Sequence, residues 1–502
     1  MIIVHKQKKE LCVSKALFFL SIDYICNMNK RVLLHIILFV LIFGCDNIKD
    51  EKKVPFEKLS SDVTGINFSN IITPDIETSE NLFDYDYFYN GSGVGIADIN
   101  NDGLKDVLFT ANQQMNRLFL NKGNLTFEDI TESSNINSKN KKWSSGVTFA
   151  DVNNDGWLDI YISQGGPYDS DSRKNLLLIN NQDLTFTEKG EEYGLDDTGI
   201  STQSAFFDFD KDGDLDCVVM NENEFYGYDP ISFFKKYENK SVLMENSSHL
   251  YEQKDGKFIN ITEKAGLLSP TFGLGLCISD INNDNWPDIY IANDYYVKDA
   301  MYINNQDGTF TNQIKKSTKQ ISFYGMGVDI EDINNDNLSD IFVLDMASSD
   351  HVRSKTLMAS MNTSNFDLIT NKLDQHYQYM FNSLQLNLGN DKYHNISHQL
   401  NIAKTDWSWA GLIFDYNLDG NEDIFVTNGY RKYGSDNDSR IRINETKKEY
   451  NNKVPVEMKK RLYDELPSEK LPNLLYKNEG NLTFKEVGNN SVLNDPSFSN
   501  GA

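Results

Sequence analysis

One nine-residue pattern occurs six times in this chain of 502 residues and limits the folds that it can adopt. It reads Asp, any residue, Asp or Asn, any residue, Asp, Gly or Asn, two further residues and Asp. The copies start at Asp98, Asp151, Asp208, Asp280, Asp332 and Asp415. Position 6 is always Gly or Asn, the residues that most readily adopt the positive φ of a sharp turn. Such a loop presents oxygen atoms at positions 1, 3, 5 and 9 and a backbone carbonyl at position 7, which suits a hard cation.

The six loops predict structural Ca²⁺ sites, up to six in number. The predicted ligands are the side chains at positions 1, 3, 5 and 9 and the backbone carbonyl at position 7: Asp98, Asn100, Asp102, Leu104 and Asp106; Asp151, Asn153, Asp155, Trp157 and Asp159; Asp208, Asp210, Asp212, Asp214 and Asp216; Asp280, Asn282, Asp284, Trp286 and Asp288; Asp332, Asn334, Asp336, Leu338 and Asp340; Asp415, Asn417, Asp419, Asn421 and Asp423. The carboxylates at these positions would repel one another without a cation. Folding is therefore expected to depend on Ca²⁺, with affinities of roughly 10⁻⁴ to 10⁻³ M as in extracellular modules.

The residues after each loop exclude an EF-hand. An EF-hand needs a bidentate Glu at position 12 and a helix on each side of the loop. Position 12 is instead apolar in every copy, as at Phe109, Ile162 and Val219, and it ends a triplet that is mostly β-branched or aromatic. Such triplets are typical of buried strands. Each loop is therefore expected to join two β-strands.

A larger unit of about four strands surrounds each loop. A strand of small residues precedes the loop, as in residues 93–97, and a later strand ends in Asn, as at Asn121 and Asn180. Successive loops start between 52 and 83 residues apart. Four-stranded repeats of this length predict an all-β fold: a β-propeller of about seven blades, the last incomplete, with small helical insertions. A linear β-solenoid is the alternative, but its repeats are much shorter.

These units resemble FG-GAP (VCBS-type) repeats, the Ca²⁺-loop blades of integrin α-chain propellers and of many bacterial surface proteins. Residues 89–98 (YNGSGVGIAD), 405–410 (TDWSWA) and 427–431 (TNGYR) are also similar to bacterial lipoproteins related to the cartilage acidic protein group. Members of that group often carry an ASPIC/UnbV module after the propeller. The resemblance covers roughly residues 60–502. It implies a calcium-loop propeller and no particular molecular activity.

The end of the sequence repeats the beginning of a unit. Residues 497–501 read Ser-Phe-Ser-Asn-Gly and are comparable to Trp409-Ala410-Gly411, which lies shortly before the loop at Asp415. We therefore expect the chain to enter a seventh unit and stop before its calcium loop, as a fragment of a longer protein would. The alternative is a natural end, with a strand over residues 64–68 closing the ring.

The N-terminal part predicts a bacterial lipoprotein. Residues 28–44 have a basic start, an apolar run and a small residue before Cys45, as in a lipoprotein signal peptide. Cys45 is expected to carry the lipid, residues 45–60 to form a tether and residues 61–502 to form the propeller. We expect residues 1–27 to be upstream sequence or a misassigned start. Acidic residues at 50 and 51 resemble a surface-export signal, so we expect an outer-membrane protein that faces the cell exterior. An ordinary transmembrane anchor is the alternative.

The predicted function is binding or adhesion at the cell surface, to a glycan or protein ligand, without catalysis. A net charge of −26 disfavours binding to nucleic acid. Insertions at about residues 222–248, 346–382 and 429–472 are candidate recognition segments. Candidate ligand-face residues are Tyr377 and Tyr379, and also Trp407 and Trp409, which we expect to point to opposite sides of a strand, with core packing as the alternative role. Two other functions are possible on this pattern. One is a polysaccharide lyase or hydrolase, whose catalytic carboxylates would come from outside the loops, for example Asp345 or Glu222. The other is a structural spacer for a further module.

Overall fold

The computed structural model describes residues 2–5, 56–137, 143–357, 363–489 and 491–501. The predicted signal peptide, residues 28–44, and Cys45 lie outside this part of the chain. Within it, no helix is long and apolar enough to cross a membrane.

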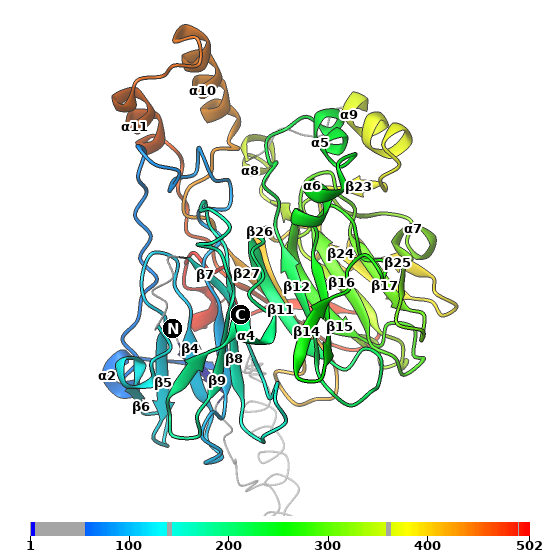
Figure 1. Ribbon diagram of the computed structural model, residues 1–502. Helices are drawn as coiled ribbons and strands as arrows, with labels where there is room; N and C mark the ends of the chain where they lie inside the picture. The colour runs from blue at the N-terminus through cyan, green and yellow to red at the C-terminus, as the bar shows by residue number, and fades with distance from the viewer. Residues whose placement is uncertain (1, 6–55, 138–142, 358–362, 490, 502) are drawn as a thin grey trace, which may run out of the picture.

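Six antiparallel sheets of four strands follow one another along the chain (Figure 1). We call them blades 1 to 6. The repeat of four strands per unit that the loops predicted is confirmed. Their strands are β3 (Val94–Ala97), β4 (Asp106–Phe109), β5 (Arg117–Asn121) and β6 (Phe127–Asp129); β7 (Ser144–Ala150), β8 (Asp159–Gln164), β9 (Leu176–Asn180) and β10 (Phe186–Glu188); β11 (Ser201–Phe207), β12 (Asp216–Asn221), β13 (His249–Lys254) and β14 (Lys257–Asn260); β15 (Gly273–Ser279), β16 (Asp288–Asn293), β17 (Ala300–Asn304) and β18 (Phe310–Asn312); β20 (Val328–Glu331), β21 (Asp340–Val343), β24 (Ser383–Asn387) and β25 (Tyr393–Asn395); and β26 (Asp406–Phe414), β27 (Asp423–Asn428), β28 (Leu474–Asn478) and β29 (Phe484–Val487). Blade 6 gains a fifth strand, β22 (Met346–Ala347), which pairs with β26.

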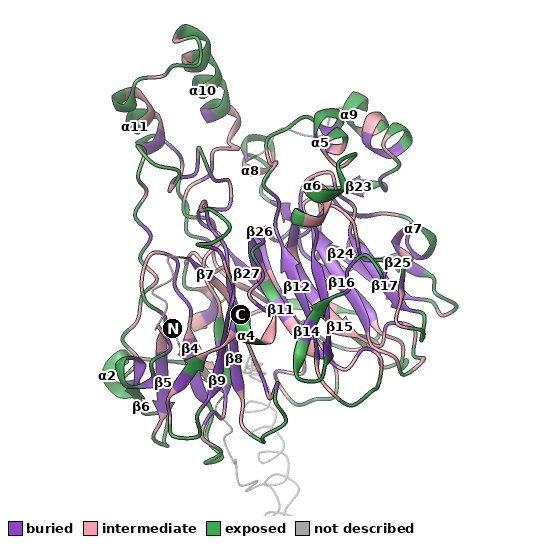
Figure 2. Cartoon of the chain, in the orientation of Figure 1, coloured by how far each residue is buried: buried purple, intermediate pink, exposed green. Residues whose placement is uncertain are grey.

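The core lies between consecutive blades, because each sheet buries both faces. Strands β8, β12 and β16 are buried along their whole length (Figure 2). One apolar cluster joins Leu108 of blade 1 to Ile160 of blade 2, and equivalent clusters join each later pair of blades. Sheets that stack face to face around an axis in this way form the propeller-like all-β fold that the repeat predicted.

Glycines in or beside the first strands of blades 2, 4 and 5 let these blades approach the next blade very closely. A Cβ atom on Gly146, Gly275 or Gly327 would lie less than 3 Å from a backbone carbonyl oxygen of the following blade. Residues 497–501 occupy the position between blades 6 and 1: the Ser499 amide donates to the Asn428 carbonyl, and Asn500 Nδ2 donates to the Tyr89 carbonyl. Seven chain segments therefore surround the axis.

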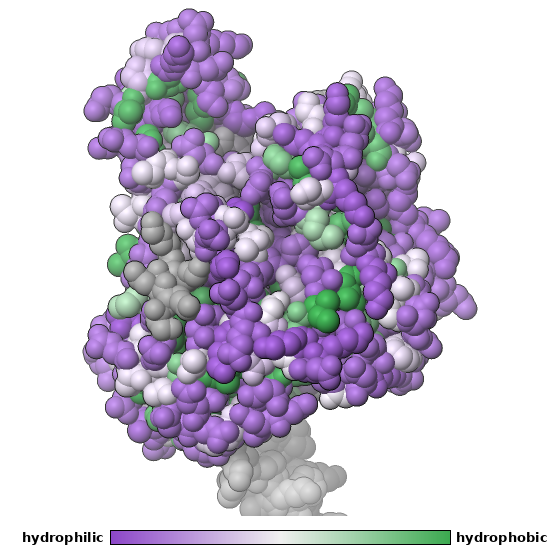
Figure 3. Space-filling view, viewed as in Figure 1, coloured by the Kyte–Doolittle hydropathy of each residue, from purple (hydrophilic) through white to green (hydrophobic). Residues whose placement is uncertain are grey.

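The Asp-rich loops and the insertions lie at opposite ends of the blades. Each loop joins the first strand of a blade to the second, whereas each insertion joins the second strand to the third. We call the two ends the loop face and the insertion face. The insertions carry α5 (Pro230–Lys236) and α6 (Lys240–Glu245); α8 (Arg353–Thr356), α9 (Thr363–Asp367) and the π-helix η2 (Leu368–Lys372); and α10 (Asn437–Glu449) and α11 (Val456–Asp464), all near the top of Figure 1. The surface over α10 and α11 that faces the viewer in Figure 3 is mostly hydrophilic.

The remaining elements are short. Helices α3 (Thr131–Ser134), α4 (Gly190–Tyr193) and α7 (Ile314–Ser317) follow the outer strands of blades 1, 2 and 4, and β19 (Ile321–Ser322) pairs with β23 (Gln378–Tyr379). Strand β1 (Ile2–His5) pairs with β2 (Phe56–Leu59), and the 3₁₀-helix η3 (Val492–Asn494) precedes the last segment. The alternative of a closing strand over residues 64–68 is wrong, because α2 (Ser61–Thr64) ends there and Gly65 adopts φ 77°.

Candidate functional site

The six Asp-rich loops share one backbone conformation. Position 6 has a positive φ in every copy, from 66° at Asn337 to 99° at Gly213, as the sequence predicted. Position 4 has a positive φ as well, for example 58° at Asn101 and 57° at Leu418. These two left-handed residues turn the backbone so that its amides point to the carboxylate at position 1. In the first loop, Asp98 accepts hydrogen bonds from the amides of Asp102 and Gly103 at 3.2 and 2.8 Å.

The Asp at position 9 differs from the other predicted ligands because it is fully buried. Asp288 accepts hydrogen bonds from the backbone amides of Ile281 and Asn304, at 3.0 and 2.7 Å. Burial raises the pKa of Asp288 to about 7, against the opposing effect of these two donors. Asp106, Asp159, Asp216 and Asp340 accept the same pair of bonds in their own blades. This residue therefore connects the loop to its own third strand, a role that the ligand pattern did not predict.

The Asn that ends the third strand connects neighbouring blades. Asn304 Nδ2 donates to the carbonyl of Pro287 in its own loop and to the carbonyl of Phe209 in the preceding loop. Asn180 and Asn478 form the equivalent pair of bonds. The Asn seen at this point of the repeat is thus explained by blade packing.

The third loop has the most concentrated negative charge. Carboxylate oxygens of Asp208, Asp210 and Asp216 lie within 4.8 Å of one another, and no other His, Cys, Asp or Glu group of the described chain is clustered as tightly for a metal. Oδ1 of Asp208 and Oδ1 of Asp214 are buried and have no hydrogen-bond partner among the described residues. The donor set consists only of oxygen atoms, which is the set that Ca²⁺ prefers.

The insertion face contains a cavity of about 320 Å³, which we call the insertion-face cavity. Its aromatic lining comes from segments far apart in the chain: Phe83, Tyr87, Tyr295, Tyr324, Trp407, Trp409 and Tyr430. Its charged lining residues are Asp86, Asp294 and Arg440. A second cavity of about 330 Å³ lies along the axis and shares Tyr87, Asn90, Met326 and Trp409 with the first.

Residues 81–90, which we call the tyrosine segment, hold this face together. Tyr85 OH donates to Glu222 of the first insertion at 3.0 Å, and Tyr87 OH donates to Asp294 at 3.1 Å. The tyrosine segment also accepts a hydrogen bond: Tyr295 OH, just after β16, donates to Asp86 at 2.7 Å. Burial raises the pKa of Glu222 to about 8 and that of Asp294 to about 7. The alternating tyrosines at 85, 87 and 89 are a visible sequence signal for this segment, which lies outside the repeat pattern.

The predicted ligand-face residues fall into two separate groups. Trp407 and Trp409 both line the insertion-face cavity, and both stack on Tyr430, at ring-centroid distances of 4.6 and 5.4 Å. The expectation that they point to opposite sides is wrong, because residues two apart in a strand share a face. Tyr377 and Tyr379 are instead exposed, beside Phe366 and outside this cavity.

The carboxylates suggested for catalysis have structural partners. Asp345 is fully buried and accepts hydrogen bonds from the Ser322 hydroxyl and from the amides of Phe323, Tyr324 and Met346. Glu222 lines the axial cavity and is bound by Tyr85. These contacts explain why both carboxylates are buried, without assigning either of them a catalytic role.

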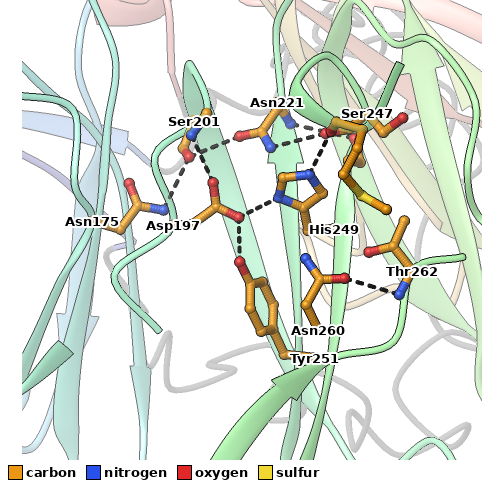
Figure 4. A network of polar contacts seen from close by, with 12 residues as sticks. Asn175, Asp197, Ser201, Asn221, Ser247, His249, Tyr251, Asn260 and Thr262 are labelled. Carbon is orange, nitrogen blue, oxygen red and sulfur yellow. Dashed lines mark hydrogen bonds and ion pairs between the residues drawn. The ribbon is translucent and has the colours of Figure 1, made fainter. Parts of the chain in front are cut away.

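A buried polar network joins blades 2 and 3 (Figure 4). Asp197 accepts hydrogen bonds from His249 Nδ1 at 2.5 Å and from Tyr251 OH at 2.7 Å. His249 Nε2 lies 2.8 Å from the Met244 carbonyl, so both ring nitrogens face acceptors and the imidazolium form fits best. Burial alone would lower the pKa of His249, but Asp197 outweighs burial and raises it to about 9.

This network predicts a loss of stability in alkaline solution. The folded-state pKa of His249 lies above its unfolded value of about 6.5, so its stabilising effect is complete below pH 6.5 and disappears as the pH rises through 9. We expect the free energy of unfolding to fall by on the order of 3 kcal/mol more in the wild type than in His249→Gln between pH 6 and pH 9.5. Urea unfolding at constant Ca²⁺ measures both values, and parallel pH curves would contradict the assignment.

Two segments of the chain, residues 98–162 and 280–343, match the FG-GAP-like repeat. The chain therefore contains FG-GAP-like repeats in these two segments, which hold the loops that start at Asp98, Asp151, Asp280 and Asp332. Cartilage acidic protein 1 of Xenopus tropicalis is 30% identical to it over 135 residues, which are 27% of this chain and 20% of that protein. The match therefore spans about a fifth of that relative.

Two solved structures resemble this protein in part. One is that of an Agrocybe aegerita lectin that recognises non-reducing terminal N-acetylglucosamine, with a TM-score of 0.39, 14% identity, and coverage of 83% of this chain and 84% of that one. The other is the V. cholerae biofilm matrix protein Bap1, with a TM-score of 0.30, 12% identity, and coverage of 52% of this chain and 36% of that one.

Proposed function

We propose that this protein is a calcium-stabilised binding protein of the cell surface, whose ligand site lies on the insertion face. The observation that carries the proposal is the insertion-face cavity, which gathers aromatic side chains from several blades at the end of the axis. Concave, mainly apolar sites with a few polar groups are the usual form of ligand sites. The ligand is an extracellular glycan or protein.

Calcium has a structural role in this proposal. In each loop the ion would be held by the side chains at positions 1, 3, 5 and 9 and by the carbonyl at position 7, and it would neutralise carboxylates that otherwise repel one another. The loops lie on the face opposite the cavity, so the ion stabilises the propeller and does not touch the ligand.

The proposed location is the outer membrane, with a lipid on Cys45 and the propeller facing outward. The signal-like residues 28–44 and the acidic residues after Cys45 support this proposal. Replacing Cys45 by Ser is expected to move the protein from the membrane fraction to the soluble fraction of cells. Retention of the variant in the membrane would contradict lipid anchoring.

The choice of face is tested by blocking each face with a polymer. Ile441 is exposed on α10 of the insertion face, and Lys122 is exposed in a turn on the loop face. We expect a maleimide polymer on Ile441→Cys to reduce binding of the whole chain to immobilised glucans, mannans, galactans or collagen at least tenfold. The same polymer on Lys122→Cys should leave binding unchanged. Wild-type protein treated with the same reagent is the control for reaction at native thiols. Equal losses at both positions would contradict a ligand site on the insertion face.

A further inference from the structure

Two carboxylates line the insertion-face cavity, and no basic side chain of the described residues forms an ion pair with either of them. They are Asp86 of the tyrosine segment and Asp294, which follows β16. Tyr295 OH donates to Asp86 and Tyr87 OH donates to Asp294, so each acid is held by the residue that follows the other. A tyrosine hydroxyl supplies a hydrogen bond but no positive charge. A cation that enters the cavity would therefore meet two carboxylates that no side chain neutralises.

Asp86 offers an accessible oxygen atom. Its side chain is only partly buried, and its Oδ2 accepts the hydrogen bond from Tyr295. Its Oδ1 accepts no hydrogen bond from a described residue and is not one of the buried unpaired side-chain atoms of that part of the chain, so it is open to solvent. Asp294 is buried, and its two oxygens accept from Tyr87 OH and from the Tyr295 amide. Asp86 can therefore contact a ligand directly, whereas Asp294 acts through its charge.

The aromatic lining favours an organic cation over a metal ion. Phe83, Tyr295 and Tyr324 line the cavity and are each partly exposed. The face of an aromatic ring attracts an ammonium group that lies within about 6 Å of its centre. Ca²⁺ instead needs about six to eight oxygen ligands, and two carboxylates among aromatic rings do not supply them.

One positive charge also lines the cavity, but it is exposed. Arg440 lies on α10 and is open to solvent, where salt screens a charge much more than in a buried position. Burial raises the pKa of Asp294 to about 7, and the neighbouring charges of Asp345 and Asp86 act in the same direction. The buried side of the cavity is therefore negative, which disfavours an anion and favours a cation.

We propose that the insertion-face cavity binds the ammonium group of an alkylamine, paired with Asp86 and enclosed by Phe83, Tyr295 and Tyr324. This inference rests on the proposed function and specifies the group that the ligand places in the cavity. The volume of about 320 Å³ lies at the lower end of the range for small-molecule sites, roughly 300–1,000 Å³, and suits a single short chain or ring. An amino sugar of a glycan and a lysine side chain of a protein both carry such a group.

The test is a calorimetric titration of the whole chain, in 10 mM CaCl₂ at mildly alkaline pH and matched ionic strength, with butylammonium chloride and with butanol. Butanol has nearly the same length but carries a neutral hydroxyl group in place of the ammonium group. We expect butylammonium to saturate a single site and to bind about tenfold more tightly than butanol. Titrations with glucosamine and with the amide of α-acetylated lysine then distinguish the two sources. The tighter binder of these two identifies a glycan or a protein as the source, and either result supports the site.

Two substitutions in the cavity should change the affinity in opposite directions. Asp86→Asn keeps an oxygen acceptor for Tyr295 but removes the charge, and it is expected to weaken butylammonium binding about tenfold. Arg440→Gln removes an exposed charge of the same sign as the ligand and should strengthen binding roughly two- to fivefold at low salt. Asp84→Asn is the matched control, because Asp84 is exposed in the same segment and does not line the cavity.

Two results would overturn the cation site: butylammonium binds no more tightly than butanol, or folded Asp86→Asn binds it as tightly as Asp84→Asn does. If the polymer-blocking experiment still places binding on the insertion face, the proposed function stands and only the ligand group fails. If that experiment shows equal losses at both positions, the proposed site fails as well. Melting temperatures show whether each variant is folded. Should Asp86→Asn unfold, the gain expected for Arg440→Gln decides the question, because a disturbed fold would not strengthen binding.

Discussion

Removing Ca²⁺ is expected to lower the free energy of unfolding of this protein by roughly 8–16 kcal/mol. At 10 mM free Ca²⁺ and dissociation constants of about 10⁻⁴ to 10⁻³ M, each occupied loop contributes roughly 1.4–2.7 kcal/mol. Six occupied loops together give the range of roughly 8–16 kcal/mol. For a folded region of about 450 residues, the corresponding drop in melting temperature is roughly 8–17 °C.

Differential scanning calorimetry in 10 mM CaCl₂ and in excess EGTA, at matched ionic strength, measures this drop. Magnesium is the control, because it demands a tighter octahedral geometry and gives up its water reluctantly. We expect Mg²⁺ to restore only a small part of the loss. Equal melting temperatures in calcium and in EGTA would show that the loops are stable without the ion.

Asp288→Asn is expected to destabilise the protein by about 3 kcal/mol even when no calcium is present. Asp288 is fully buried, and its two oxygens accept hydrogen bonds from the amides of Ile281 and Asn304. Asparagine offers only one oxygen, so one backbone amide loses its partner and faces an NH₂ group. The measurement is urea unfolding of the variant and of the wild type in EGTA.

Asp284→Asn, at position 5 of the same loop, is the matched control. Its carboxylate is only partly buried, and its contacts lie mainly within the loop. In EGTA it should cost less than about 1 kcal/mol, whereas in calcium both variants should lose stability because a predicted ligand has changed. Equal losses in EGTA would show that Asp288 has no structural role beyond that of a ligand.

The sequence was a good guide wherever the signal was local and repeated. Six copies of one loop fixed the positions of strands, turns and positive-φ residues such as Gly103 and Asn285, because each of these depends on its immediate neighbours. The insertion-face cavity could not be predicted in the same way. Its walls come from residues 82–90, 294–295, 407–409 and 430, which only the closed arrangement of blades brings together.

Two errors have simple physical causes. The wrong expectation for Trp407 and Trp409 came from misreading the two-residue period of a strand, which places both side chains on one face. The alternative of a strand over residues 64–68 rests on the likeness of these residues to the end of a repeat, Ile261 to Leu267. In that repeat the residues after the fourth strand form a turn, as they do around Gly65.

The glycines that line the axis determine how a ring of this kind can change in size. Gly146, Gly275 and Gly327 each let one blade approach the backbone of the next, so in these three blades the distance to the neighbour is specified within the repeat itself. A duplicated repeat would bring its own spacing with it and would need no adjustment elsewhere. The size of the ring is therefore expected to change by whole blades and not by gradual adjustment of the spacing between them.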